Sequence, residues 1–444
     1  MTLARELVRT LRAAAKRPLP ENVARAARLH FADAVGVGLA AASSSVGAPY
    51  LRYAAQAPSG PSTVFGHPRG TTAADAAMVN GGLIHSLEFD DTHTASIAHG
   101  SSVLAATALA AGEAAGASGA ALLGAYARGW EVLIRFGLAS PGRFQSRGFQ
   151  ITSVGGALAA ALVAAEINGL TEDEALAALG ISLSQASGVL EFLTNGSSVK
   201  SLHPGWAAHA GMVAAALAKA GMTGPETSLE GRHGLFRQFA GDERAAERFS
   251  GLLPDIGTRW HLEDAAYKFY PCCHYLHPFI EAAGLLADKV GTTGRILCRV
   301  PAGAAPVICE PWEAKQAPGT PHAARWSLPI VVAARIAEGK VDLGTFERPA
   351  TPAVVSLAKR ISWEPLFNAR FPERFEAEIE CQGRTVRIDD VYGNTTRPAT
   401  PDAVRDKFFT NGGSEELWSA IQAQQSARDI GAALKRNVKK EATI

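Results

Sequence analysis

Residues 207–218 read AAHAGMVAAALA, and small apolar side chains recur in this stretch at intervals of three and four residues. This spacing places them on one face of an α-helix. The same spacing returns repeatedly from about residue 3 to residue 265, for example between Val23 and Val35. Because small side chains let helix backbones approach closely, the pattern predicts a compact all-α domain of antiparallel neighbours.

The pattern changes beyond this region. Residues 295–300 form a short apolar run that predicts a strand, and residues 375–381 alternate between apolar and charged side chains. A Gln-Gly pair then leads into residues 385–388, so these two segments predict a β-hairpin. Helical spacing is found in residues 278–290 and 328–338. We therefore expect a smaller α+β domain in this part of the chain.

Helix-start signals support this division. Thr171 precedes three carboxylates, and Thr400 precedes a proline and an aspartate. A capping hydroxyl followed by early acids or proline stabilises a helix N-terminus. The sequence predicts a mainly α fold with a helical main domain at residues 1–266, an α+β domain at residues 267–395 and a C-terminal helical segment at residues 396–444.

The composition argues against several classes of partner. Lys and Arg total 43 while Asp and Glu total 42, so the chain lacks the basic excess that nucleic acid or an anionic membrane usually requires. With 444 residues and 47% apolar content, the chain can bury a large core. We expect a globular protein that binds a small molecule, with no nucleic-acid partner and no membrane partner.

The expected location follows from three features. The first residues mix charged with apolar side chains, unlike the apolar core of a signal peptide. No uncharged apolar run reaches the length of about 18 residues that a membrane span needs. The five cysteines all follow residue 271 and form no disulfide framework. We expect a cytoplasmic protein.

The most polar interruption of the helical half is the segment 86–93, which reads SLEFDDTH and is followed by His99. Acids, a hydroxyl and imidazoles at this density can place a general base beside a bound acid. Two other interpretations stay open. The acids and Thr92 could cap a helix while the histidines are solvated. The histidines of residues 85–99 and Glu88 could instead bind a metal ion, although their spacing matches no strong zinc motif.

Two further polar clusters interrupt apolar segments. Lys200 and His203 lie in a glycine-bounded turn before an Ala-rich helix, whose N-terminal N–H groups could receive a carboxylate. A surface lysine in a capping loop is the alternative. Lys268, Cys273 and His277 lie at the proposed domain junction, where a cleft commonly holds a ligand. For the cysteine alone, the role of a small buried hydrophobe is the alternative.

Two remaining signals concern anions. Arg147, with Arg143 nearby, could bind substrate carboxylates through its planar guanidinium, or could be an ordinary arginine of a surface loop. Neither the G-x-x-x-x-G-K-[ST] pattern nor a G-x-G-x-x-G between a strand and a helix is present. Nucleotide chemistry is therefore disfavoured.

The three polar clusters, in this order, resemble the motifs of the MmgE/PrpD family, which includes a dehydratase, a decarboxylase and an epimerase of small carboxylic acids. Residues 87–93 with His99 are similar to the family's L-[DE]-[FY]-D-D-T-H…H segment. Residues 200–208 are similar to K-x-L-H-x-G-W-A-A, and residues 268–277 to K-x-x-P-x-C-x-x-x-H. The resemblance spans essentially the whole chain.

The resemblance implies an all-helical main domain formed by both ends of the chain, a smaller α+β lid domain, a homodimer and a pocket between the domains. It implies no organic cofactor and no metal. Taken together, the motifs and the resemblance predict the following site. The catalytic residues are Glu88, Thr92, His99, Lys200, His203 and Lys268. The substrate-binding residues are Asp91, His93, Arg147, Gln150, Cys273 and His277.

Some positions depart from the pattern of the family. Gln150 stands where the decarboxylases and dehydratases tend to carry histidine, and Ile330 where tyrosine is common. Glu88 stands where decarboxylases have aspartate, and Cys273 where they have histidine. These departures argue against a full decarboxylase apparatus.

The reactions that the resemblance implies share removal of a proton from a carbon next to a carboxylate, and the resulting carbanion needs cations or hydrogen-bond donors. We expect a cofactor-independent lyase that acts on a small di- or tricarboxylate, with elimination of water as the leading outcome. His99 or Glu88 would be the base. Lys200 and Lys268 would hold carboxylates, and Thr92 with His203 would position the leaving or reprotonated group.

Three alternatives stay open. An isomerase or epimerase would return the proton and expel nothing, and a decarboxylase would expel carbon dioxide. A non-catalytic relative that only binds carboxylates belongs to a different class, although buried lysines carry a desolvation cost that such a relative has no reason to keep.

Overall fold

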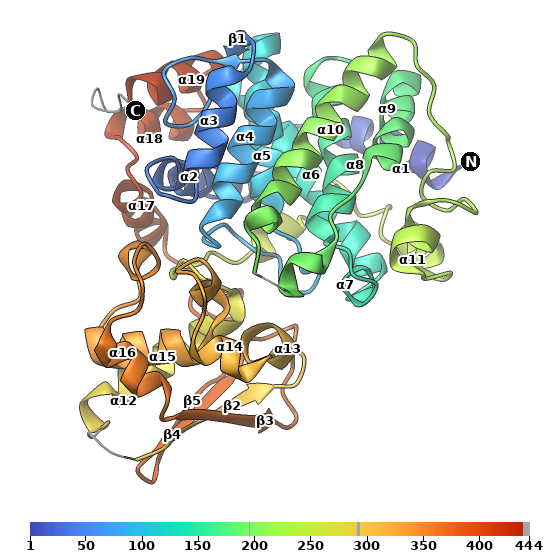
Figure 1. Cartoon of the computed structure of the whole chain (residues 1–444). Helices are drawn as coiled ribbons and strands as arrows, with labels where there is room; N and C mark the ends of the chain where they lie inside the picture. Colours follow the sequence, from blue (N-terminus) through green and yellow to red (C-terminus); the bar gives the residue numbers. More distant parts are fainter. Residues whose placement is uncertain (195, 291–293, 438–444) are drawn as a thin grey trace.

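The computed structural model describes residues 1–194, 196–290 and 294–437 (Figure 1). The protein is mainly α with one small sheet, as the sequence predicts. Its buried apolar residues form two separate cores. The larger core draws on residues 4–265 and on residues 408–434, while the smaller core draws on residues 272–381.

The larger part of the molecule is built almost entirely from helices. Its α-helices are α1 (Leu3–Ala15), α2 (Glu21–Ala42), α3 (Ala48–Gln56), α4 (Ala73–Ser86), α5 (Gly100–Ala115), α6 (Gly119–Ala139), α7 (Arg143–Ser146), α8 (Ile151–Ile167), α9 (Glu172–Gln185), α10 (Leu202–Lys219) and α11 (Ala245–Gly251). Short helical turns are η1 (Leu190–Thr194), η2 (Ser198–Ser201), η3 (Phe236–Ala240) and η4 (His261–Asp264). One short strand, β1 (Ser59–Ser62), accompanies them. Among the described helices, none has both the length and the hydropathy that crossing a membrane requires.

Small residues set the helix spacing at the centre of this part. α10 packs against α4 and α8, and a Cβ added at Gly205 would lie 2.3 Å from the carbonyl oxygen of Met78. A Cβ added at Gly211 would lie 2.5 Å from the Ala160 Cβ. Backbones this close leave no room for larger residues. The approach at Gly205 therefore holds the start of α10, which carries His203, against α4.

The smaller part contains a four-stranded sheet in the order β3-β2-β4-β5. β2 (Ile296–Pro301) confirms the predicted strand, and β4 (Ala377–Cys381) pairs antiparallel with β5 (Arg384–Ile388) as the predicted hairpin. β3 (Ile361–Leu366) is missing from the prediction and pairs parallel with β2. A parallel partner that is distant in the sequence leaves no hairpin signal.

The helices of this part lie above the sheet in the view of Figure 1. They are η5 (His274–Leu276), α12 (His277–Leu286), η6 (Ala287–Lys289), α13 (Ala305–Ile308), α14 (Trp312–Gln316), η7 (Ala323–Trp326), α15 (Leu328–Glu338), η8 (Leu343–Phe346) and α16 (Pro352–Ala358). α12 packs against β4, β5 and α15. The bounds of α15 are those that the helical spacing predicts.

The C-terminal helices return to the larger part of the molecule. α17 (Pro401–Thr410), α18 (Glu415–Gln422) and α19 (Ala427–Arg436) pack against α2 and α5 (Figure 1). The predicted helix starts are confirmed, because Thr171 forms a capping box at α9 and Thr400 caps α17. The domain boundaries at residues 266 and 395 stay predictions. Residues 438–444 of the predicted C-terminal segment lie outside the described residues.

Lys407 of α17 is a buried cation. Its Nζ lies 2.8 Å from Asp33 Oδ1 in α2 and donates a hydrogen bond to the Phe89 carbonyl oxygen at 2.9 Å. Burial lowers the pKa of Lys407 and raises the pKa of Asp33, while the attraction between the two charges opposes both shifts. This ion pair ties the C-terminal helices to α2 and to the loop that follows α4.

We predict that Lys407→Met lowers the free energy of unfolding by about 3–5 kcal/mol, because it leaves the Asp33 carboxylate buried without its partner. Urea unfolding followed by circular dichroism measures this change. The double variant Asp33→Asn/Lys407→Met should recover much of the loss. As a matched control, Lys435→Met, at an exposed position on α19, should change stability by less than about 0.5 kcal/mol. Wild-type stability of Lys407→Met would contradict the role of this ion pair.

Candidate active site

The loop between α4 and α5 is held by three buried cations. The backbone carbonyl groups of residues 87–89 each accept a hydrogen bond from one of them. Arg325 Nη1 lies 2.9 Å from the first oxygen, Lys268 Nζ 3.2 Å from the second and Lys407 Nζ 2.9 Å from the third. The three donors come from η7, from the segment before η5 and from α17. Both parts of the molecule therefore meet at this loop.

Glu88 has a strained backbone at the centre of this loop. Its φ is +52°, in the left-handed region, which costs a residue other than glycine about 1–2 kcal/mol. The flanking hydrogen bonds restrain the backbone in this conformation. The buried Glu88 carboxylate forms an ion pair with Lys200 of η2, and its Oε2 lies 3.7 Å from Lys268 Nζ. The strained residue thus brings the first, second and third sequence motifs together.

The charges around Glu88 determine its protonation. Burial alone would raise its pKa, but the positive charges of Lys200 and Lys268 outweigh burial, and the net effect holds the pKa far below its usual range. Glu88 is therefore ionised at neutral pH. A carboxylate with so low a pKa is a weak base.

His99 lies at the N-terminus of α5 beside Thr92. Its Nδ1 lies 3.0 Å from Thr92 Oγ1 and 3.1 Å from the Asp91 carbonyl oxygen. Because a carbonyl oxygen can only accept, Nδ1 carries the proton and Nε2 keeps a free lone pair. Burial, reinforced by Lys268, holds the pKa of His99 well below its ordinary value. His99 is thus a neutral imidazole that can accept a proton.

A chain of hydrogen bonds orients a second histidine. His85 Nδ1 donates to Asp90 Oδ2 at 2.8 Å, since a carboxylate can only accept. His85 Nε2 lies 3.4 Å from the Gln150 amide nitrogen, and Gln150 Oε1 lies 2.7 Å from His203 Nδ1. This chain places the proton of His203 on Nδ1 and its lone pair on Nε2. Burial, with His85 and Lys200, lowers the pKa of His203 to about 4.

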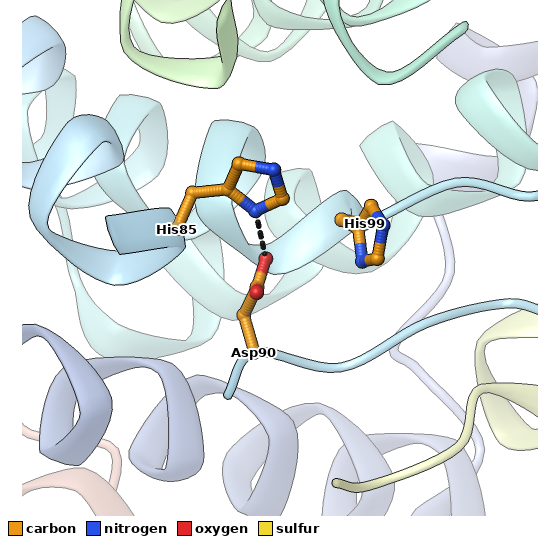
Figure 2. A group of neighbouring side chains, drawn as sticks. All are labelled: His85, Asp90 and His99. Atoms are coloured by element: carbon orange, nitrogen blue, oxygen red, sulfur yellow. Dashed lines mark hydrogen bonds and ion pairs between the residues drawn. The ribbon is translucent and has the colours of Figure 1, made fainter. Parts of the chain in front are cut away.

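His85, Asp90 and His99 form a compact group in which the candidate ligand atoms lie within 4.8 Å of one another (Figure 2). These three residues are the ones that could hold a metal ion at this position. Glu88 and His93, which the metal interpretation of the sequence includes, do not belong to the group. Lys268 and Lys200 act electrostatically on the same His99 and would repel an added cation.

Three predicted substrate-binding residues lie apart from the Glu88 ion pairs. The Asp91 carboxylate bonds to His30 Nδ1 at 2.8 Å, and His93 Nδ1 bonds to Ser96 at 2.8 Å. Arg147 is exposed and bonds to the Gln238 backbone oxygen at 3.4 Å. The structure does not bring these three side chains together with the rest of the cluster.

His93 belongs to a second group that could hold a metal ion, together with His261 and Asp264. Its ring centre lies 6.1 Å from that of His261, and Arg259 Nη2 lies 2.9 Å from the Asp264 carboxylate. Burial, with the positive influence of His261, lowers the pKa of His93 to about 3. The arginine already compensates the only carboxylate of this group.

Cys273 and His277 belong to the core of the smaller part. The Cys273 backbone N–H donates to the Arg325 carbonyl oxygen at 2.9 Å, and burial raises the pKa of its thiol. The His277 ring packs against Tyr270, with ring centres 5.2 Å apart, and burial lowers its pKa well below the usual value. Cys273 lies within electrostatic range of Lys200, Glu88 and Lys268, and His277 lies within range of Lys268.

The structure adds four residues that are absent from the predicted site: His85, Asp90, Arg325 and Lys407. The first two lie inside or beside the polar segment that identifies the site, so its composition could have pointed to them. Arg325 and Lys407 belong to no motif. Nothing in the local sequence predicts that either side chain reaches residues 87–89.

We predict that the imidazoles of His99 and His203 stay neutral while the pH falls through 6.5. Both pKa values are lowered, so protonation comes later, near pH 4 for His203. Histidine-selective ¹⁵N NMR across a pH titration measures this directly. His99→Asn and His203→Asn assign the resonances. A titration midpoint near 6.5 for either residue would contradict the environment described above.

Two family models and several curated proteins match most of this chain in sequence. The MmgE/PrpD N-terminal domain matches residues 5–248, and the MmgE/PrpD C-terminal domain matches residues 270–429. A cis-aconitate decarboxylase-like protein, oryM, of Aspergillus oryzae is 28% identical over 429 residues, which cover 88% of this chain and 86% of that protein. Cis-aconitate decarboxylase of Homo sapiens is 29% identical over 389 residues, covering 82% and 77%, and that of Mus musculus is 28% identical over 415 residues, covering 88% and 83%. With both domains matched across most of its length, the chain belongs to the MmgE/PrpD family.

Proposed function

We propose that this protein is a lyase that removes a proton from the carbon next to a carboxylate of a small di- or tricarboxylic acid and then expels water. The observation that carries the proposal is the convergence of Lys200 and Lys268 on one buried carboxylate, Glu88, beside the neutral imidazole of His99. Cations and an uncharged base are the two requirements of this chemistry.

His99 is the proposed base. Its Nδ1 proton is committed to the Asp91 carbonyl oxygen, which leaves the Nε2 lone pair free. Glu88 is the weaker candidate, because the two lysines hold its pKa far below the usual range. We assign Glu88 instead to keeping both ammonium groups in place when no substrate is bound.

The lysines are the proposed anion-binding groups. A substrate carboxylate can replace Glu88 as a partner of Lys200, which is partly exposed, whereas Lys268 is fully buried. Their charges would stabilise the carbanion that forms when the proton leaves. In a site with little water, one such donor is worth about 3–4 kcal/mol of transition-state stabilisation.

Thr92 and His203 are the proposed positioning groups. Thr92 Oγ1 contacts His99 Nδ1 and so orients the base. His203 receives its orientation through Gln150 and keeps its lone pair on Nε2, so it would hold the departing hydroxyl group as a hydrogen-bond acceptor. The proton that His99 takes from the substrate would leave with this hydroxyl group as water. The mechanism proposed here requires no organic cofactor and no metal.

Decarboxylation is the second candidate, because the relatives in Aspergillus oryzae, Homo sapiens and Mus musculus carry the name cis-aconitate decarboxylase or a name like it. The side chain of Gln150 argues for elimination of water instead. An amide does not ionise near neutral pH, so Gln150 is a poor acid and cannot itself reprotonate a carbanion left by loss of carbon dioxide. Epimerisation remains the third outcome. The homodimer and the cytoplasmic location also stay predictions.

The reaction can be identified by proton NMR in D₂O with a panel of citrate-, aconitate-, malate- and aspartate-like acids, with and without a chelator. A new alkene signal with loss of water from the product mass supports the dehydratase. Loss of carbon dioxide supports the decarboxylase. Exchange of a substrate proton for deuterium, with no group lost from the molecule, supports the epimerase. Binding of these acids without turnover would contradict the proposal and favour a non-catalytic relative.

We predict that Lys200→Ala lowers kcat/KM by about 100- to 1,000-fold on the substrate so identified, because the variant removes one cation from the developing negative charge. Steady-state kinetics measures the loss, and circular dichroism verifies folding. Lys219→Ala, an exposed lysine at the end of α10, serves as the matched control and should keep wild-type kinetics. Near-normal activity of Lys200→Ala would rule out its role.

A further inference from the structure

A cavity of about 660 Å³ lies in the smaller part of the molecule, away from the candidate active site. α12, α15 and β5 contribute to its walls, and these elements lie together in the lower part of Figure 1. Its lining includes four arginines: Arg335, Arg374, Arg387 and Arg397. None of the residues that surround Glu88 lines this cavity.

Two of the four arginines are neutralised by carboxylates in the cavity wall. Arg397 Nη1 lies 2.7 Å from Glu281 Oε2, and Arg387 Nε lies 2.9 Å from Asp389 Oδ1. The third carboxylate, Asp390, accepts hydrogen bonds from Asn394 and from backbone N–H groups. Every carboxylate in the wall therefore has partners of its own.

Arg335 and Arg374 carry the remaining positive charge. Within the described ranges, neither guanidinium has a carboxylate within ion-pair distance. Arg335 Nε is buried and has no hydrogen-bond partner in that part of the chain. A buried donor without a partner is unfavourable, because folding removes its water and supplies no other acceptor.

The wall is shaped to accommodate the Arg335 guanidinium. A Cβ added at Gly284 of α12 would lie 2.7 Å from both Arg335 Nε and Nη2. Only glycine at this position lets the guanidinium lie against the helix. Arg374 is half-buried, so its charge is also partly removed from water. Two partly buried guanidinium groups that have no carboxylate partner in the described part of the chain match the requirements of a bound anion.

We propose that this cavity binds a small oxyanion with at least two charged groups, in the class of organic polyphosphates and polycarboxylates. Arg335 and Arg374 supply the charge-assisted hydrogen bonds. Tyr270 is part of the wall and lies two residues after Lys268. An anion in the cavity would therefore contact the same chain segment that supplies a cation to Glu88.

Isothermal titration calorimetry with inorganic pyrophosphate, at fixed ionic strength, tests the proposal. Wild-type protein should bind one pyrophosphate per chain. Arg374→Gln and Arg335→Gln should each weaken binding by at least about tenfold, because each removes a charge-assisted hydrogen bond. Arg374 is half-buried and lies outside the helices, so its variant tests the site even if Arg335→Gln disturbs packing against Gly284.

Two controls separate this cavity from other sites. Arg52→Gln removes an exposed charge on α3 and should leave binding unchanged. Lys200→Ala should also leave pyrophosphate binding unchanged, because Lys200 does not line the cavity. This experiment stands independently of the proposed reaction, since it measures no turnover.

Titration of citrate into Lys200→Ala, and into the double variant Lys200→Ala/Arg374→Gln, identifies the chemical class of the anion. A loss of citrate affinity caused by Arg374→Gln supports a polycarboxylate ligand, whereas binding of pyrophosphate alone supports a polyphosphate. The proposal is overturned if neither probe binds, or if both bind the Arg335 and Arg374 variants as tightly as the wild type.

Discussion

Three hydrogen bonds from buried cations to the carbonyl groups of residues 87–89 hold the centre of this molecule together. Arg325 comes from the smaller part, Lys407 from the C-terminal helices and Lys268 from the segment between the two cores. Without these donors, the left-handed backbone at Glu88 would lose its restraint, and its carboxylate would lose its position between two lysines. The arrangement of both parts and the electrostatics of the site therefore depend on the same short loop.

The buried groups of the site keep different charge states. Burial lowers the pKa of Arg325 to about 10, yet the group remains protonated at neutral pH. Burial also favours neutral histidines, and the nearby lysines act in the same direction on His99 and His203. An ionised carboxylate, two ammonium groups and neutral imidazoles can therefore coexist within one cluster. This combination separates the anion-binding groups from the proton-accepting group, which suits proton removal next to a carboxylate.

The same physical criterion distinguishes structural charges from functional ones. Lys407 and Asp33 form an ion pair with each other within the fold, as do Arg397 and Glu281 in the wall of the cavity. Arg335 and Arg374 lack such partners within the described ranges, and Lys200 is partly exposed while its carboxylate partner is buried. Charges that the fold leaves incompletely paired are those with most to gain from a ligand.

The amino-acid sequence by itself determined the mainly helical content, the hairpin at β4 and β5, the helix starts at Thr171 and Thr400, and the family motifs. These features depend on residues only a few positions apart, so local spacing reveals them. Only the tertiary structure decided which polar side chains meet. Asp91 and His93 are close to Glu88 in sequence but bond to His30 and Ser96 instead. Arg325 and Lys407 reach the loop across 238 and 318 residues of chain, and contacts at such separations arise from packing, which leaves no trace in a local pattern.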